Sequence, residues 1–236
     1  PPSGLRDRVL AEVATTRQEP PVVDLSRRRA RRTRAAWLLV AAAVLLVLGV
    51  AGGLLLDRGT GRTGSTELAD VLDVGSGDRA AASALAPYCR SLTCVDTNQR
   101  MIEAARERLQ KLKHFTARVA DVHELPFAAA SFDAVLMFHT LTYAENPAKA
   151  LTECARVLRP GGRLVVLCLD EHRQHEITAP YGERHPGFSP AKVRELLANT
   201  GLVVRTSEIA CRESRKPHLQ VVLAIASKPA PLSPDS

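Results

Sequence analysis

Residues 71–77 read Val-Leu-Asp-Val-Gly-Ser-Gly, an apolar run that ends in two glycines around a serine. A short apolar run bounded by glycine is typical of a buried strand. We expect a helix to follow over about residues 78–86, and its first N–H groups favour an anionic group at the turn. Small residues at the turn also let the backbone approach a ligand closely. The stretch therefore predicts the first strand of an α/β domain and one wall of a ligand site.

Strands and helices alternate along the chain after this turn. Continuous apolar strands that alternate with helices indicate a parallel sheet covered on both faces. The last two strands follow each other directly and predict an antiparallel hairpin. We therefore expect an α/β fold with a Rossmann-like, doubly wound, seven-stranded and mostly parallel sheet. The further expected strands are residues 92–96, 115–121, 132–138, 163–169, 202–211 and 219–226, and the further expected helices are residues 98–113, 147–158 and 190–199.

Polar residues stand where the first three predicted strands end. Asp96 ends the second strand about 20 residues after the glycines, a spacing at which a carboxylate accepts hydrogen bonds from ribose hydroxyls. Asp121 ends the third strand. In doubly wound sheets, ligands bind at the carboxyl ends of the strands, near the switch in strand order. A single residue of this kind could be a turn or a helix cap, but three strand ends in register favour a ligand site.

Five short motifs follow one another along the predicted sheet. They read Val-Leu-Asp-Val-Gly-Ser-Gly (71–77), Cys-Val-Asp (94–96), Ala-Asp-Val-His-Glu-Leu-Pro-Phe (120–127), Ser-Phe-Asp-Ala-Val (131–135) and Val-Leu-Arg-Pro-Gly-Gly-Arg-Leu (157–164). As an ordered set they resemble class I S-adenosylmethionine-dependent methyltransferases, over about residues 68–228. A dinucleotide-dependent dehydrogenase would account for the glycines alone. Residues 181–190 and 211–218 resemble the methyltransferase domain fused to arsenical-resistance-type winged-helix repressors.

The resemblance implies that S-adenosylmethionine is the cofactor. Asp96 would bind the ribose hydroxyls, and Thr97 and Met101 would pack beside the ribose and adenine. Asp121 would receive the adenine amino group, and the Val122 amide would bind a ring nitrogen. The glycine turn would hold the methionine end, and the end of the fourth strand would line the path to the methyl group. The implied cofactor-binding residues are Asp73, Gly75, Ser76, Gly77, Asp96, Thr97, Met101, Asp121, Val122, Met137 and Phe138.

Methyl transfer from a sulfonium is an in-line displacement, for which a protein mainly supplies proximity and orientation. A base is needed only if the acceptor loses a proton, and histidine titrates in the suitable range. The candidates for a catalytic base are His139, just past the fourth strand, and His185, with His172 and His175 in the same loop after the fifth strand. A packing role for each is the alternative. The resemblance to the repressor-fused domains implies a small-molecule acceptor.

Two features depart from the family's pattern. Arg79 stands where the family has its third glycine, and it could crowd the methionine end or pair with the cofactor carboxylate. The segment ahead of the first strand, residues 57–67, is a glycine-rich, flexible linker. It provides no lid over the predicted site. Both features weigh against activity.

The net charge of +7 is concentrated in the first quarter of the chain. Residues 1–65 hold 11 Lys and Arg against 5 Asp and Glu, and six arginines fall within residues 27–34. The remainder is almost neutral, so no nucleic-acid partner is predicted. Five cysteines without a Cys-x-x-Cys pair predict neither a metal site nor a disulfide framework. Cys168, within an apolar run, is expected to be a small buried apolar residue.

Residues 37–56 contain no charged side chain. As a helix they would extend about 30 Å, the thickness of a bilayer core. Together with the arginines before them, they predict a single transmembrane helix with a cytoplasmic N-terminus; a buried helix is the alternative. We expect residues 1–36 to be a basic, partly disordered juxtamembrane segment and residues 229–236 to be a disordered tail.

Residues 5–58 resemble the juxtamembrane and membrane-span part of bacterial anti-sigma-K-like factors. The orientation of the predicted span places the methyltransferase-like domain outside, whereas S-adenosylmethionine is cytosolic. Three possibilities remain open: another orientation, an inactive domain, or a fused chain. The first hypothesis is therefore a membrane-tethered methyltransferase. The alternative is a non-enzymatic single-span regulator that binds a sigma factor and carries an inactive methyltransferase-like module.

Overall fold

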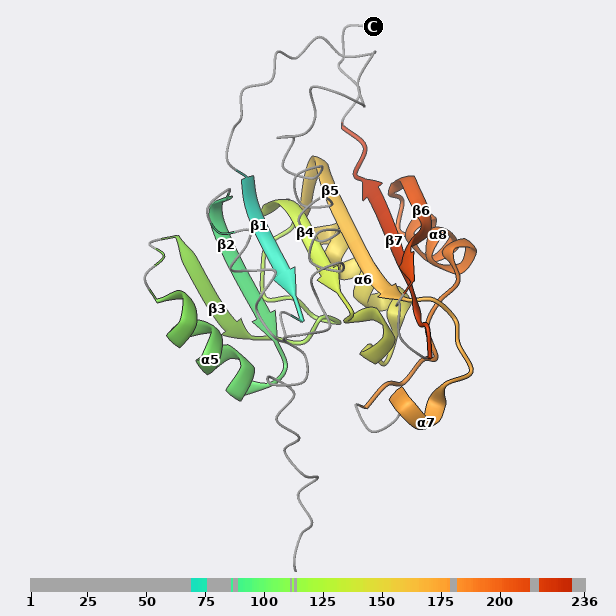
Figure 1. Cartoon of the computed structure of the whole chain (residues 1–236). Coiled ribbons are helices and arrows are strands. Elements are labelled where there is room, and N and C mark those ends of the chain that lie inside the picture. Colours follow the sequence, from blue (N-terminus) through green and yellow to red (C-terminus); the bar gives the residue numbers. More distant parts are fainter. Residues whose placement is uncertain are drawn as a thin grey trace, which may run out of the picture. The chain divides into compact units, whose positions relative to one another are not determined.

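A seven-stranded sheet forms the centre of the computed structural model (Figure 1), with the strand order β3-β2-β1-β4-β5-β7-β6. The strands are β1 (Ala69–Val74), β2 (Cys89–Asp96), β3 (Phe115–Val119), β4 (Phe132–Phe138), β5 (Leu158–Leu169), β6 (Val203–Arg212) and β7 (Gln220–Ser227). The helices are α5 (Gln99–Leu109), η2 (Leu141–Tyr143), α6 (Pro147–Val157), α7 (His175–Thr178) and α8 (Pro190–Ala198). The structure describes residues 69–75, 86, 89–110, 112, 114–178, 182–212 and 217–230.

The pairing within the sheet confirms the expected α/β fold. β1 pairs in parallel with β2 and β4, β2 with β3, and β4 with β5. β7 runs antiparallel between β5 and β6, so the predicted C-terminal hairpin is also confirmed. Strand order reverses between β1 and β4, which makes their carboxyl ends the switch point of the sheet.

Three of the helices begin at side-chain caps that the sequence supplies. Asn98, Asn146 and Ser189 accept hydrogen bonds from backbone N–H groups in the first turns of α5, α6 and α8. Proline occupies the first position of both α6 and α8, where its missing N–H costs nothing. These signals explain why the predicted starts of these helices agree with the structure to within one residue.

Several predicted boundaries differ from the structure by a few residues. The helix expected to run to residue 113 ends at Leu109, and the third strand ends at Val119 because the chain turns back after it. There, the Glu124 N–H donates to the Asp121 carbonyl (3.1 Å) and closes a turn. β5 begins at Leu158 instead of residue 163, with a register shift opposite the start of β4.

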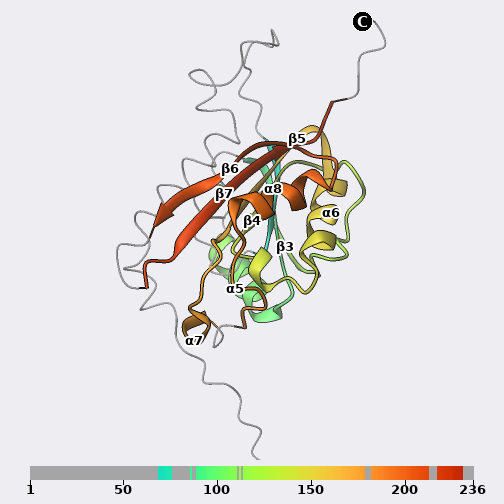
Figure 2. The same ribbon diagram turned by 90° about the vertical axis from the view of Figure 1, so that its right-hand side faces the viewer.

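The sheet carries an apolar cluster on each face. α6 and α8 pack on one face, together with residues such as Leu72, Val135 and Val166. Figure 2 shows these two helices on the same side of the sheet. α5 covers β2 and β3 on the other face, where Ile102 is fully buried. Alternate strand residues therefore belong to different clusters, as expected for a sheet buried on both sides.

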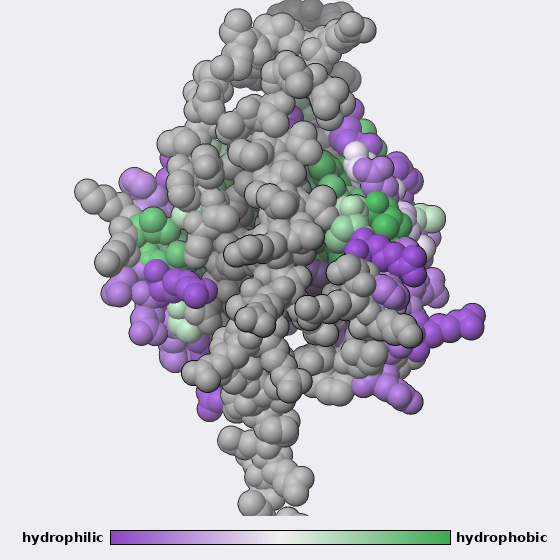
Figure 3. Space-filling view, viewed as in Figure 1, coloured by the Kyte–Doolittle hydropathy of each residue, from purple (hydrophilic) through white to green (hydrophobic). Residues whose placement is uncertain are grey.

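A few large apolar side chains are exposed on the described part of the chain. On the face shown in Figure 3, apolar side chains are visible in one area at the left and in another at the right. The large apolar residues that are exposed are Val119 on β3, Tyr143 on η2, and Val203 and Ile209, which both lie on β6.

The predicted transmembrane helix lies outside the described residues, as do the juxtamembrane segment, the linker and most of the tail. Among the helices that the structure does describe, none combines the length and the apolar character that a bilayer crossing requires. The longest of them, α5 and α6, have 11 residues each.

An ion network joins four strands at the amino edge of the sheet. Arg159 Nη1 lies 2.9 Å from Asp70 Oδ2 and 2.8 Å from Asp133 Oδ1. The Asp70 N–H donates to Asp133, and Ser91 Oγ donates to Asp70. Burial opposes ionisation of Asp70, but the hydrogen bonds from Arg159 and Ser91 outweigh it and hold the pKa of this carboxyl below its usual range. The charged groups at this edge therefore serve the fold.

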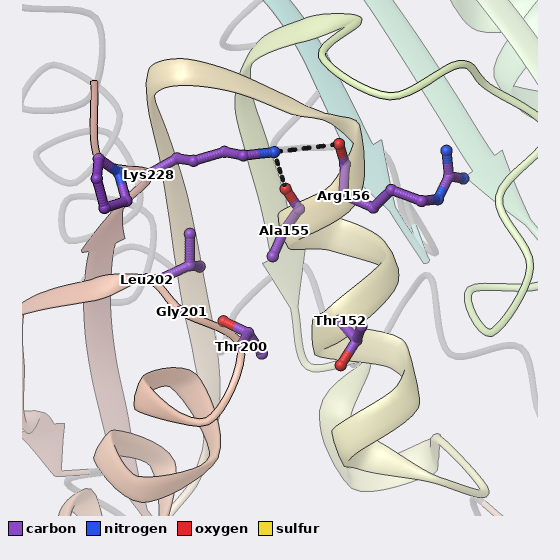
Figure 4. Close-up of a pocket in the computed structure, with 8 residues that line it drawn as sticks. Thr152, Ala155, Arg156, Thr200, Gly201, Leu202 and Lys228 are labelled. Carbon is purple, nitrogen blue, oxygen red and sulfur yellow. Dashed lines mark hydrogen bonds between the residues drawn. The ribbon is translucent and has the colours of Figure 1, made fainter. Parts of the chain in front are cut away.

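Lys228 closes the C-terminal end of α6 (Figure 4). Its Nζ donates to the carbonyl oxygens of Ala155 and Leu158, both at 2.8 Å, and of Arg156 at 3.3 Å. The side chain borders a pocket of about 340 Å³ that Thr152, Thr200, Gly201, Leu202 and Pro229 also line. This pocket lies at the amino end of β5. The Lys228 amine, the one amine among its lining residues, already donates to backbone carbonyls. We therefore assign it a structural role.

Replacing Lys228 with Met should lower the free energy of unfolding by about 1–2 kcal/mol, because α6 loses charge-assisted hydrogen bonds at its C-terminus. Thermal denaturation measures the effect. Lys192→Met is the matched control, since Lys192 is exposed and pairs only with Glu195 three residues away. Equal stability of the two variants would show that the contacts of Lys228 contribute nothing beyond an exposed ion pair.

Candidate functional site

The carboxyl ends of β1 to β4 meet at one edge of the sheet, which we call the switch edge. The Gly75 N–H donates to the Val95 carbonyl (2.8 Å), and Val74 stands opposite Met137. Most of the residues that the sequence assigns to the cofactor stand at the ends of these strands or just after them. Ser76, Gly77 and Arg79 lie outside the described residues.

The turn after β1 requires glycine for two independent reasons. Gly75 has a φ of +69°, a conformation that other residues adopt only with strain. A Cβ at this position would also overlap Oγ1 and Cγ2 of Thr140. Thr140 Oγ1 donates to the Val74 carbonyl at 2.8 Å, so this threonine braces the end of β1. Sequence reasoning missed Thr140, because nothing in its own neighbourhood indicates a contact 66 residues away.

Asp73 is almost completely buried, at 2% exposure. Cys94 Sγ, on the neighbouring strand, lies 4.0 Å from its Oδ2 and donates to it. The carboxylate therefore belongs to the interior of the β1–β2 pair. The resemblance implied that Asp73 holds the methionine end of the cofactor, and that role stays a prediction.

Asp96 and the start of α5 form the second part of the site. Asp96 Oδ1 accepts a hydrogen bond from the Asn98 N–H at 2.9 Å, which fixes the carboxylate at the strand–helix junction. Thr97 is exposed, and Met101 is half-buried in the first turn of α5. The structure thus brings these three predicted residues together.

Asp121 is held by two donors from one residue. Its Oδ1 accepts the His123 backbone N–H at 2.9 Å and lies 2.6 Å from His123 Nδ1. The backbone N–H of His123 is the main cause that keeps the pKa of Asp121 below its usual range; partial burial acts against it, and the ring of His123 adds to it. The carboxyl is therefore ionised at neutral pH while its side chain stays 58% exposed. Val122, next to it, packs its side chain into the core.

An ion pair on α6 holds the loop that carries Asp121. Glu153 Oε2 accepts the Leu125 N–H at 2.9 Å, and Arg156 donates to the carbonyls of Leu125 (2.9 Å) and Phe127 (2.8 Å). Glu153 and Arg156 also bind each other at 2.7 Å. Hydrogen bonding by Arg156 lowers the pKa of Glu153 against the effect of burial. Sequence reasoning missed this pair; its only signal was an acidic and a basic residue three positions apart on α6.

Residues at the end of β4 divide between core and surface. Met137 is fully buried in the core cluster with α6, so its predicted place on the path to the methyl group has no support from the structure. Phe138 points to the opposite face and is partly exposed, because alternate strand residues face opposite sides. His139 follows with a φ of +56°, and its N–H donates to the Leu167 carbonyl at 2.7 Å.

Two of the candidate histidines, His185 and His172, lie in the loop after β5, and each makes contacts within the protein. His185 Nε2 donates to the Ala144 carbonyl at 2.9 Å, and its ring lies 5.3 Å from Phe188. His172 Nδ1 accepts the Gln174 N–H at 3.2 Å, and its Nε2 lies 3.5 Å from Glu183 Oε1. Both rings therefore tie the loop to itself or to Ala144, just after η2. His139 is exposed at the switch edge.

The cysteines behave as apolar residues. Burial raises the pKa of the Cys89, Cys154 and Cys168 thiols to about 12. Cys168 is fully buried, which confirms its expected place in the core. Across the described part of the chain, no cluster of three or more potential metal ligands occurs.

This chain is similar to known methyltransferases over part of its length. Residues 72–166 match the family described as "Methyltransferase domain". A demethylmenaquinone methyltransferase of Tropheryma whipplei is 41% identical over 136 residues, which are 58% of this chain and 56% of that protein. An O-methyltransferase of Pyrenophora dematioidea is 30% identical over 175 residues, 67% of this chain and 61% of that protein.

Among solved structures, a putative sarcosine dimethylglycine methyltransferase from Galdieria sulphuraria has the same fold, with a TM-score of 0.64 and 18% identity. The match covers 83% of this chain and 88% of that one. Residues 72–166 thus match a methyltransferase domain, as the sequence predicted, and the solved structure shows the same fold. The chain spans less than two thirds of the two relatives above. Its resemblances to repressor-fused domains and to anti-sigma factors stay predictions.

Gly75→Ala should destabilise the protein by about 2–3 kcal/mol, through overlap with Thr140 and a strained φ. Removing the Thr140 side chain as well relieves the overlap. The double variant Gly75→Ala/Thr140→Ala should therefore lose less stability than the sum of the single variants, as measured by a double-mutant cycle in urea. Strict additivity would show that the two residues do not meet.

The Glu153–Arg156 pair should make stability depend on acid pH. Because the pKa of Glu153 is lowered in the folded chain, its contribution is present above the ordinary value of 4.5 and is lost as the pH falls through the folded pKa. Glu153→Gln should cost about 1–2 kcal/mol at pH 7, and the deficit should shrink below about pH 4.5. Melting temperatures of both proteins across pH measure this; Glu195→Gln, at an exposed pair, is the control. A deficit that is the same at every pH would refute the assignment.

Proposed function

We propose that this chain transfers a methyl group from S-adenosylmethionine to a small-molecule acceptor. The observation that carries the proposal is the Asp121 carboxylate at the switch edge, ionised and held through Oδ1. Its Oδ2 accepts no hydrogen bond from any residue that the structure describes. An exposed oxygen of this kind suits a donor such as the amino group of adenine. The match of residues 72–166 to the methyltransferase domain family supports the same conclusion.

Each part of the switch edge has a proposed role toward the cofactor. Asp96, fixed by Asn98, binds the ribose hydroxyls, with Thr97 and Met101 beside them. Asp121 binds the adenine amino group. The turn at Gly75, together with the residues that follow it, holds the methionine end. The chemistry of this donor set, two carboxylates at adjacent strand ends, fits a nucleoside.

When bound, S-adenosylmethionine supplies a methyl group activated by its sulfonium, which an acceptor atom takes in line as the carbon–sulfur bond breaks. The protein's task is to orient the two reactants and to receive a proton if the acceptor carries one. Of the two histidines that the sequence proposes, His139 has an exposed place at the switch edge. His185 has its Nε2 proton engaged by Ala144, so only Nδ1 could act as a base.

The proposal of a small-molecule acceptor draws on the names of the two relatives, a demethylmenaquinone methyltransferase and an O-methyltransferase. Attachment to a membrane through residues 37–56, with the N-terminus cytoplasmic, remains a proposal from the sequence alone. A reporter fused after Ser236 tests it. A signal from the outer side of the membrane would place the domain away from cytosolic cofactor and would contradict the enzymatic proposal.

Calorimetry with the full-length chain tests the cofactor site. S-adenosylmethionine should bind, and Asp96→Asn and Asp121→Asn should each weaken binding about tenfold or more, because each removes a charged hydrogen-bond acceptor. Glu103→Gln, an exposed change on α5, should leave the affinity unchanged. A folded chain that binds no S-adenosylmethionine at millimolar concentration would refute the proposal. Transfer of labelled methyl to the low-mass fraction of a cell extract would support a small-molecule acceptor.

A further inference from the structure

His123 occupies an unusual place in the Asp121 loop. Its side chain is only 16% exposed, although the carboxylate beside it is 58% exposed. Its two ring nitrogens contact two different elements: Nδ1 lies 2.6 Å from Asp121 Oδ1, and Nε2 lies 3.0 Å from the Asn146 backbone nitrogen. The imidazole therefore spans from the loop after β3 to the residue that caps α6.

The backbone of Asn146 determines which nitrogen of His123 carries the proton. An amide N–H can only donate, so Nε2 must be the acceptor in that contact. A neutral imidazole has one donor and one acceptor, which leaves the proton on Nδ1. Nδ1–H then donates to Asp121, in a charge-assisted hydrogen bond consistent with the short distance. Asn146 is itself held, because its side chain accepts the Lys149 N–H at 3.0 Å.

We propose that His123 is a positioning residue for adenine: it orients the Asp121 carboxylate so that Oδ2 faces the cofactor's amino group. This inference rests on the proposed function. Both donors of His123, its backbone N–H and Nδ1–H, bind the same oxygen, Oδ1. Rotation of the carboxylate would break the ring contact, so Oδ2 keeps a fixed direction. With both nitrogens engaged, the ring itself has no hydrogen-bonding group left for the ligand.

Two conservative substitutions separate the two contacts of the ring. In His123→Asn, the side-chain amide nitrogen lies near the place of Nδ1 and can still donate to Asp121, but nothing reaches Asn146. In His123→Gln, the longer side chain places its amide near Nε2 and loses the Asp121 contact. His123→Ala loses both, and all three variants keep the backbone N–H donor. His114→Ala, an exposed histidine just before β3, is the matched control.

The test compares S-adenosylhomocysteine with S-inosylhomocysteine, which carries an oxygen in place of the adenine amino group. Calorimetry with the full-length chain should show the wild type and His123→Asn preferring the adenine compound by about tenfold or more. The preference should fall about three- to tenfold in His123→Ala and His123→Gln, and His114→Ala should behave as the wild type. Thermal denaturation of every variant reports folding separately.

The outcomes separate the inference from the function on which it rests. A folded wild type that binds neither compound would refute the proposed function. A wild type that discriminates, with folded Ala and Gln variants that discriminate equally well, would overturn the role of His123 alone. Equal weakening of both compounds in these variants would show a merely structural role and would also overturn it. Kinetics provide a second readout: a positioning role predicts a higher KM for S-adenosylmethionine with kcat little changed.

Discussion

The candidate site depends on one constraint, the parallel pairing of β1 with both β2 and β4. Parallel strands end at the same edge, and the reversal of strand order next to β1 leaves that edge open to a ligand. Asp96 and the loop that carries Asp121 reach this edge because β2 and β3 continue the parallel order outward. The close approach of Thr140 to Gly75 belongs to the same constraint, since the chain that leaves β4 must pass beside the end of β1.

α6 holds the Asp121 loop at the switch edge from two directions. Near its start, Asn146 fixes the ring of His123; two turns later, Glu153 and Arg156 bind the backbone around Leu125 and Phe127. Among the described elements, the loop between β3 and β4 contains no helix that would satisfy its backbone groups. The contacts from α6 bind these backbone groups instead. An exposed carboxylate on such a loop keeps its direction only because polar groups from a packed helix satisfy the loop's backbone.

The sequence predicted the sheet and most of the site because both leave local signals. Apolar runs, glycine turns and caps such as Asn98 mark where elements begin and end, and the motif residues Asp96 and Asp121 stand directly after strands. The structure places the Met137 side chain in the core, and the sequence could not foresee this because it depends on which face of β4 the side chain takes. Thr140, Glu153 and the bridging role of His123 were missed, because their partners are 23 to 66 residues away.

By itself, therefore, the sequence determined the α/β class, the hairpin, the methyltransferase motifs and the carboxylates that meet at the switch edge, since these follow from periodicity and from residues adjacent in the chain. Only the tertiary structure decided how that edge is held. The proton on His123, the engaged Nε2 of His185 and the requirement for glycine at position 75 all arise from hydrogen bonds or steric contacts between segments distant in sequence. Local propensities cannot predict such contacts, because these contacts form only when the helices and strands pack together.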